Sequence, residues 1–137
     1  MAKSITITKK DFDRLKALIP AEMDPADPDK QVLRDLRGEL ERAHVVEPNE
    51  IDPDIVTMNS QVRIRDVDSG DENEYTIVYP QASDFSKGKI SILVPLGTAL
   101  LGYRKGDIIE WNMPGGIRKI KVVKVLYQPE ANGNFSA

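Results

Sequence analysis

The chain has 137 residues, of which 40% are apolar and 30% charged, and its formal net charge is −3, with no cysteine and one histidine. This length suits one domain, with or without a small appendage, and the apolar fraction is enough for a core. The missing cysteines exclude disulfide scaffolds, thiol catalysis and Cys-ligated zinc or iron–sulfur sites. The single histidine gives little support to a His-rich metal site or a Ser-His-Asp triad.

A first helix is predicted to follow Thr8. Thr8 is suited to the N-cap position, and Asp11, three residues later, favours the positive end of the helix dipole. Apolar residues then recur at steps of three and four on one face, from Phe12 to Ile19. We expect Pro20 to end this helix, because proline has no backbone N–H and its ring clashes with the preceding turn.

An acidic segment follows the first helix. Residues 21–29 contain two prolines and no basic residue, which predicts a connecting loop rather than a continued helix. Its four carboxylates belong to Glu22, Asp24, Asp27 and Asp29. These acids either keep a solvated loop soluble or contact a basic partner surface, and the sequence leaves both interpretations open.

A second amphipathic helix is predicted from its cap, Asp29, to about Ala43. Its apolar residues recur at steps of three, four and three, the pattern of a coiled-coil seam. They are Leu33, Leu36, Leu40 and Ala43. Two such helices joined by a short loop pair antiparallel. We therefore expect residues 1–48 to form a short helical hairpin with an acidic tip at 22–29, its base resting on the rest of the chain.

Residues 49–130 are predicted to form an antiparallel β-domain. After an extended connection through residue 60, apolar and polar residues alternate between Gly, Pro and Asp punctuation. Strands are expected at 62–65, 75–79, 90–94, from 108 and over 117–127, with one short helix from Pro95 to Gly102. Adjacent Val122 and Val123 indicate a bulge or a strand covered on both faces. The fold class is therefore α+β, and residues 131–137 are expected to be a loose tail.

The composition also bears on location and partners. The N-terminus lacks the apolar segment of a secretory signal, and the longest apolar stretch, residues 90–102, is too short and interrupted for a spanning helix. We therefore expect a cytoplasmic protein with no membrane partner. The mild acidity gives no reason to expect direct DNA or RNA binding. The residues Arg63, Arg65, Lys119 and Lys121 form at most a modest basic patch, for which a solvated sheet face is the simpler explanation.

One long stretch carries a family resemblance. Residues 90–116 read ISILVPLGTALLGYRKGDIIEWNMPGG. In this order and spacing they resemble the C-terminal domain of the Gre transcript-cleavage factors. Two shorter segments resemble, more narrowly, the regulator of nucleoside diphosphate kinase family, a short-armed relative of those factors. They are VTMNS at 56–60, followed by Val62-Arg63, and VLYQP at 125–129. The resemblance covers residues 50–130 well and the first fifty only in general plan.

The resemblance implies an FKBP-like β-domain that docks on RNA polymerase at the rim of its secondary channel, with the helical hairpin projecting from it. The polymerase contact of Gre-type factors maps onto Leu93, Val94, Pro95 and Leu96. Here Val94 stands where those factors commonly have serine. From the residues alone, Leu96 suits the core as well, and Pro95 suits the first turn of the short helix.

The resemblance also implies a choice between two kinds of factor. Gre factors place acidic residues from a long coiled coil beside the polymerase's catalytic Mg²⁺, in a segment like Asp-Leu-Ser-Glu-Asn-Ala-Glu-Tyr that this chain lacks. Its tip acids are expected to face the channel from a much shorter arm. Misplacement by about 1 Å already costs orders of magnitude in rate. We therefore expect a regulator that competes with Gre factors without cleaving RNA, with no catalytic residue, metal or cofactor of its own.

Two alternatives stay open. The first is a Gre-type cleavage factor that uses the tip carboxylates with Mg²⁺, whose oxygen-ligand chemistry four acids would satisfy. The second and weaker one is a peptidyl-prolyl isomerase, which only the FKBP-like sheet suggests, because a fold does not carry a function.

Overall fold

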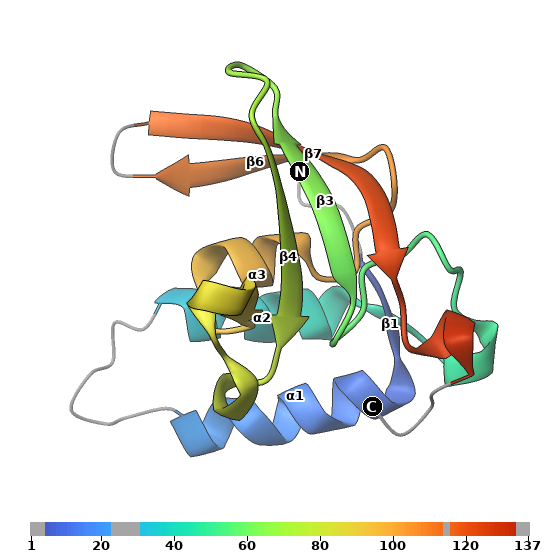
Figure 1. The fold of residues 1–137 in the computed structure, drawn as a ribbon. Coiled ribbons are helices and arrows are strands. Elements are labelled where there is room, and N and C mark those ends of the chain that lie inside the picture. The colour runs from blue at the N-terminus through green and yellow to red at the C-terminus, as the bar shows by residue number, and fades with distance from the viewer. Residues whose placement is uncertain (1–4, 23–30, 114–115, 134–137) are drawn as a thin grey trace.

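The computed structural model describes residues 5–22, 31–113 and 116–133 (Figure 1). Its helices and strands are, in chain order, β1 Thr6–Thr8, α1 Lys9–Glu22, α2 Gln31–Arg42, β2 His44–Val46, β3 Gln61–Asp66, β4 Glu72–Val78, β5 Lys89–Ser91, α3 Pro95–Leu100, β6 Ile108–Met113 and β7 Gly116–Tyr127. Four short 3-10 turns are η1 Pro48–Glu50, η2 Pro80–Ala82, η3 Phe85–Lys87 and η4 Glu130–Asn132. The chain is therefore a mixed α+β protein.

A five-stranded sheet with the order β5-β4-β3-β7-β6 forms the larger part of the fold. Its neighbours pair antiparallel, except that β5 runs parallel to β4. This parallel pair corrects the expectation of a purely antiparallel domain. It arises because the connection from β4 to β5 is long enough, with η2 and η3 inside it, for the chain to cross back to the same end of the sheet.

The two long helices share one core with the sheet. Figure 1 shows α1 leading away from β1 and α2 returning beside it. Leu15 and Ile19 of α1 and Leu36 and Leu40 of α2 are buried in the same cluster as the inward side chains of β3 to β7. Over this stretch the helices share their core with the β-domain, as expected for the base of the hairpin, while residues 23–30 of its tip lie outside the described residues. Short helices are marginal alone, so packing on the sheet stabilises them.

The sequence predicts the start of helix α1 correctly but not its end. Thr8 caps it as predicted, since its Oγ1 accepts a hydrogen bond from the Asp11 N–H at 3.1 Å. The helix continues to Glu22, so the prediction that Pro20 ends it was wrong. A proline late in a helix removes one backbone donor, and the buried Leu15 and Ile19 hold the preceding turns in place.

A short parallel pair, β1 and β2, joins the two ends of the helical segment, and it was not predicted. Thr6 lies opposite His44, and the His44 N–H donates to the Ile5 carbonyl at 2.8 Å. The residue before β1 also packs on the turn that follows α3, because Gly102, two residues after α3, lies directly against Ile5 with a φ of +82°. The N-terminal strand is thus fixed to both α2 and α3.

Strand β7 carries the bulge that Val122 and Val123 predicted. Ile64 lies opposite Val122 while the adjacent Arg63 lies opposite Lys124, so Val123 is the extra residue. A second register shift, between Gln61 and Val62, makes Leu126 another extra residue. We call the side of the sheet that faces the core the inner face and the opposite side the outer face.

The chain beyond β7 returns to the body of the protein. Residues 131 and 132, expected in a loose tail, belong to η4, and residues 134–137 lie outside the described chain. Glu130 accepts a hydrogen bond from the Thr57 hydroxyl at 2.8 Å. The Gln128 side-chain amide donates to the carbonyls of Asp52 and Ile55. These contacts join the end of β7 to the start of the β-domain.

The contact between Gly102 and Ile5 gives a stability prediction. A Cβ at Gly102 would lie 2.4 Å from the Ile5 Cβ, so Gly102→Ala forces β1 or α3 to move as well as straining a positive φ. We expect the free energy of unfolding to fall by about 2 to 4 kcal/mol, measured by urea denaturation. The matched control is Gly70→Ala, at a φ of +78° with open space around it, which carries the φ cost alone. Equal losses in the two variants would show that the Ile5 contact is unimportant.

Candidate functional site

The corner between β5 and α3, residues 93–96, is the place where the sequence predicts a partner contact. Its expected strand ends early, at Ser91, because the Ser91 carbonyl and hydroxyl accept the N–H groups of Val94 and Leu93, both at 3.0 Å, and turn the chain. Leu93 is half-buried and packs against the core, whereas Val94 is 42% exposed. Leu96 is buried. Pro95 begins α3, and its side chain lies outside the described part.

The corner is held rigidly by the packing of α3. A Cβ at Gly97 would lie 2.5 Å from the Ser91 carbonyl oxygen, so only glycine allows the helix to approach the chain this closely. The Thr98 hydroxyl donates to the Ile92 carbonyl, and the Thr98 N–H donates to the Val94 carbonyl at 3.1 Å. The exposed Val94 side chain is therefore presented from a fixed backbone.

A cavity of about 280 Å³ lies on the inner face of the sheet and shares Leu96 with this corner. Its lining consists of Ile64, Asp66, Ser69, Asp71, Asn73, Tyr75, Leu96, Arg118 and Ile120. Ile64, Leu96 and Ile120 are buried and make its lining partly apolar. Polar residues of the β3–β4 turn supply the rest, so the cavity suits an apolar side chain that is flanked by polar groups.

An ion pair lies among the polar residues of this cavity. Arg118 Nη1 lies 3.0 Å from Asp66 Oδ2. Hydrogen bonds from the backbone N–H groups of Ser69 and Asp68, with Arg118 close by, hold the pKa of Asp66 below its usual value. Asp66 is thus a carboxylate at neutral pH, and the cavity presents one fixed anion and one fixed cation beside its apolar part.

A buried carboxylate anchors α1 to the β-domain near the start of the helix. Asp11 is 1% exposed, and its carboxylate accepts the Met58 N–H at 3.1 Å and the Tyr79 hydroxyl at 3.4 Å. Burial raises the pKa of Asp11 to about 6 and raises that of Tyr79 as well. The Arg14 guanidinium lies over the Tyr79 ring, 5.8 Å from its centre. Asp11 therefore has a second role that its helix-dipole position did not predict.

The acidic tip falls outside the part of the chain that can be compared with the prediction. Asp24, Asp27 and Asp29 are not among the described residues, and Glu22 is described only through the backbone of α1. Within the described ranges, no group of three or more His, Asp or Glu side chains is placed to hold a metal ion. Likewise, no helix in those ranges has the length and apolar character needed to cross a membrane.

Two family models match the chain. The model for the C-terminal part of the transcription elongation factors GreA and GreB matches residues 51–127, which contain the corner and the cavity. The model for the Rnk N-terminus matches residues 3–46, which contain both long helices. The two matches meet where the helical segment passes into the β-domain.

Whole proteins with related sequences fall into two groups. The regulator of nucleoside diphosphate kinase of Escherichia coli (strain K12) is 38% identical over 133 residues, 96% of each chain. The transcription elongation factor GreA of Thermotoga neapolitana is 42% identical over 86 residues, which are 63% of this chain and 54% of that relative. The first similarity extends over the whole chain, and the second is partial.

Solved structures give the same picture. A prokaryotic transcription elongation factor GreA/GreB from Nitrosomonas europaea is 45% identical, with a TM-score of 0.74, and the match covers 92% of this chain and all of that one. The structure of the transcription factor Gfh1 is 25% identical, with a TM-score of 0.51 over 93% of this chain. The fold is therefore of the GreA/GreB type.

The Asp11 anchor predicts a pH dependence of stability. Its pKa is 3.8 in model compounds and about 6 in the fold, so the folded protein binds the extra proton between these values. The contribution is fully present below about pH 4 and is lost as the pH rises through 6, an amount of about 2 to 3 kcal/mol. Asp11→Asn keeps the shape and removes the titration. We expect the unfolding free energy of the variant to gain on the native protein by this amount between pH 4 and 7.

The measurement is urea denaturation across that pH range. Asp13→Asn on the same helix is the control, because the Asp13 side chain is 58% exposed and its removal leaves the native pH dependence in place. Parallel pH curves for the native protein and Asp11→Asn would contradict the assignment of a raised pKa.

Proposed function

The chain belongs to the family of the regulator of nucleoside diphosphate kinase, which shares its C-terminal part with the GreA and GreB elongation factors, and on this premise we propose that it binds RNA polymerase and competes with Gre factors without cleaving RNA. Family membership makes it a transcription regulator of the elongation-factor type. The binding to RNA polymerase, the docking place, the competition and the lack of cleavage are the parts that we propose.

Docking is proposed to use the corner 93–96 together with the cavity beside it. The region shared with GreA and GreB is the β-domain that carries both. Val94 offers an exposed apolar contact on a fixed backbone, and Leu96 connects it to the cavity. An apolar side chain from the rim of the secondary channel would enter the cavity, with polar neighbours meeting Asp66 and Arg118. Because Val94 replaces the serine common in Gre factors, this contact is apolar where theirs is polar.

The core that the helices share with the β-domain is the observation that supports the non-catalytic part of the proposal. α1 and α2 have 14 and 12 residues, lengths of about 21 and 18 Å. Leu15, Ile19, Leu36 and Leu40 use much of that length for the common core. The described part of the arm is therefore anchored on the β-domain along much of its length. Competition then results from a shared docking surface, and the tip acids are predicted to face the channel entrance without reaching its metal.

The two rival functions have weaker support. The four acids between residues 22 and 29 have the oxygen-ligand chemistry that a cleavage factor needs for Mg²⁺. We propose that helices of this length do not carry them to the metal of the polymerase. A prolyl isomerase rests on the FKBP-like description of the sheet alone. The isomerases of that fold line their pocket with aromatic rings, whereas the cavity lining described here contains one, Tyr75.

Backtracked elongation complexes distinguish the competing regulator from a cleavage factor. We expect that adding the protein with Mg²⁺ leaves the RNA length unchanged and slows cleavage by an added Gre factor in proportion to concentration. RNA lengths on a denaturing gel give both readouts. Mg²⁺-dependent shortening that disappears in Asp24→Ala/Asp27→Ala would replace the proposal with the cleavage factor. No shortening together with undiminished Gre cleavage would overturn the competition.

A substitution at the corner tests the docking surface. Val94→Asp places a charge where we propose an apolar contact, so we expect binding to core RNA polymerase to weaken at least about tenfold, while the melting temperature changes little because the side chain is exposed. Val45→Asp on β2, where valine is 38% exposed, is the matched control. Surface-immobilised polymerase and calorimetry supply the two measurements. Equal loss of binding in both variants would mean that the corner is not the contact.

A further inference from the structure

The outer face of the sheet carries a set of lysines brought together by the two bulges in β7. Residues opposite each other in a ladder point to the same side. Val62 and Ile64 are buried, so Arg63 and Arg65 point outward, and so do their partners Lys124 and Lys121. Positions 121 and 124 are three apart and would face opposite sides in a regular strand. The extra residue Val123 is what places both on one face.

The second bulge extends this arrangement by one aromatic residue. Tyr127 lies opposite Gln61, which is on the same face as Arg63, so Tyr127 also points outward, and it is 40% exposed. Lys119 lies two residues before Lys121 and joins the same face from the other end. Four side chains of β7 therefore line the outer face, from Lys119 to Tyr127.

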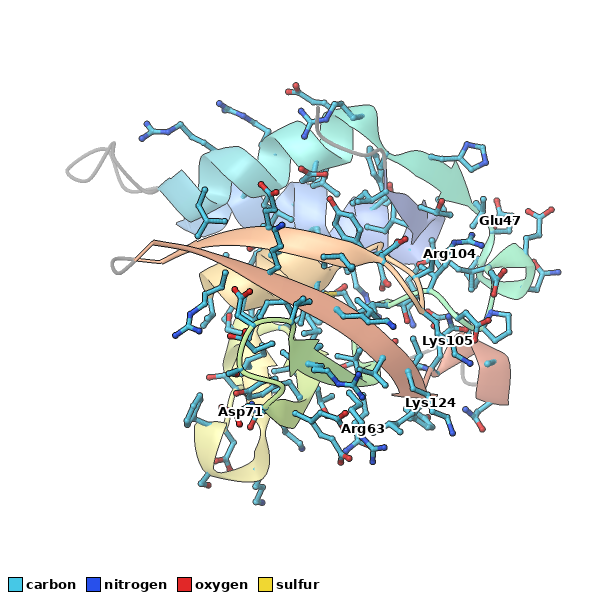
Figure 2. The ribbon with its side chains drawn as sticks, turned by 90° about the horizontal axis from the view of Figure 1, so that it is seen from above. Glu47, Arg63, Asp71, Arg104, Lys105 and Lys124 are labelled. Atoms are coloured by element: carbon cyan, nitrogen blue, oxygen red, sulfur yellow. The ribbon has the colours of Figure 1, made fainter. Side chains whose placement is uncertain are left out.

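The charges on this face are unevenly paired. Arg63 and Arg65 bind Glu74 and Glu72 on the neighbouring strand β4. Lys119, Lys121 and Lys124 make no ion pair within the described residues. Figure 2 shows Arg63, Lys124 and Lys105 around the C-terminal part of β7. Glu110 of β6 lies opposite Lys119 on this face and offsets part of its charge, so the excess positive charge lies at Lys121 and Lys124.

Large apolar side chains are exposed between these lysines. Ile108 lies opposite Lys121 and is 57% exposed, and Ile117, on the same face as Lys119, is 59% exposed. With Tyr127 they make three of the larger exposed hydrophobic residues of the described chain, all on this face. Charged side chains are enough to keep a sheet face solvated, and exposed isoleucines add nothing to its solubility. Surfaces that bind a partner combine apolar and charged side chains.

We propose that this outer face, formed by Ile108, Ile117, Lys119, Lys121, Lys124 and Tyr127, docks an acidic amphipathic segment of a partner protein. Carboxylates of the segment pair with the three lysines, and its apolar residues cover the isoleucines and the tyrosine. The exposed isoleucines favour a protein over a nucleic acid, since the bases of a single strand stack on aromatic rings and not on branched aliphatic side chains. The cavity and the corner belong to the inner side, so this second surface stays accessible when the first is occupied.

The test titrates the isotope-labelled full chain with a soluble peptide of about ten residues in which glutamates flank spaced leucines, at low salt, and follows backbone amide shifts. We expect saturable shifts confined to β6 and β7, weakened by added salt because exposed charge pairs are screened. Lys121→Gln/Lys124→Gln is expected to weaken binding about fivefold. This assumes that each lysine loses one exposed ion pair, with a binding free energy of roughly half the upper value measured for such pairs. Ile117→Ser is expected to weaken it by a similar factor.

Two matched controls and three outcomes make the test decisive. Lys16→Gln/Lys87→Gln removes the same charge from α1 and η3 and is expected to leave binding within about twofold, as surface changes elsewhere do. An all-glutamate peptide is expected to bind more weakly than the amphipathic one. The proposal is overturned by shifts centred on residues 93–96, by equal loss in the control pair, or by tighter binding of a single-stranded oligonucleotide of similar length. No saturable shift at millimolar peptide overturns it too.

Discussion

A single hydrophobic core, shared by the two long helices and the sheet, is the constraint on which the rest of the structure depends. Helices of 12 and 14 residues are close to the lower limit of independent stability. Leu15 and Leu36 are fully buried in a cluster that also contains side chains of the β-domain. The shared core therefore fixes the orientation of the described part of the helices relative to the β-domain.

The elements of the fold could be predicted wherever a local sequence pattern is compatible with only one kind of secondary structure. Alternation predicted β3 and β4, and Thr8 was recognised as a cap. The bulge at Val123 was one of two alternatives predicted from the adjacent valines, the other being a strand covered on both faces, because both valines cannot face one core in a regular strand. The same approach failed at Pro20, where tertiary packing outweighed a local breaking signal. It also failed at β1, although apolar and polar β-branched residues alternate there. A strand of three residues forms only by pairing with another strand, and its partner β2 is far away in the sequence.

The site was less predictable than the fold, for a physical reason. The corner 93–96 was located through its resemblance to a family, but the cavity beside it arises from three segments far apart in the chain, including the β3–β4 turn and Arg118. The periodicity of a sequence does not show which distant segments come together in the fold. Asp11 is a similar case. Its position near a helix start indicated a dipole interaction, while its burial against Met58 and Tyr79 depends on how the whole helix packs.

The pairing of β1 with β2 has a consequence for how such proteins diversify. The two strands fasten both helices at the same end, since β1 leads into α1 and α2 leads into β2. Extra helical turns inserted in equal number at the opposite end would lengthen the arm without shifting either strand or the sheet below. Evolution can therefore change the length of the arm by insertion or deletion at one place while the β1–β2 pair and the sheet stay the same.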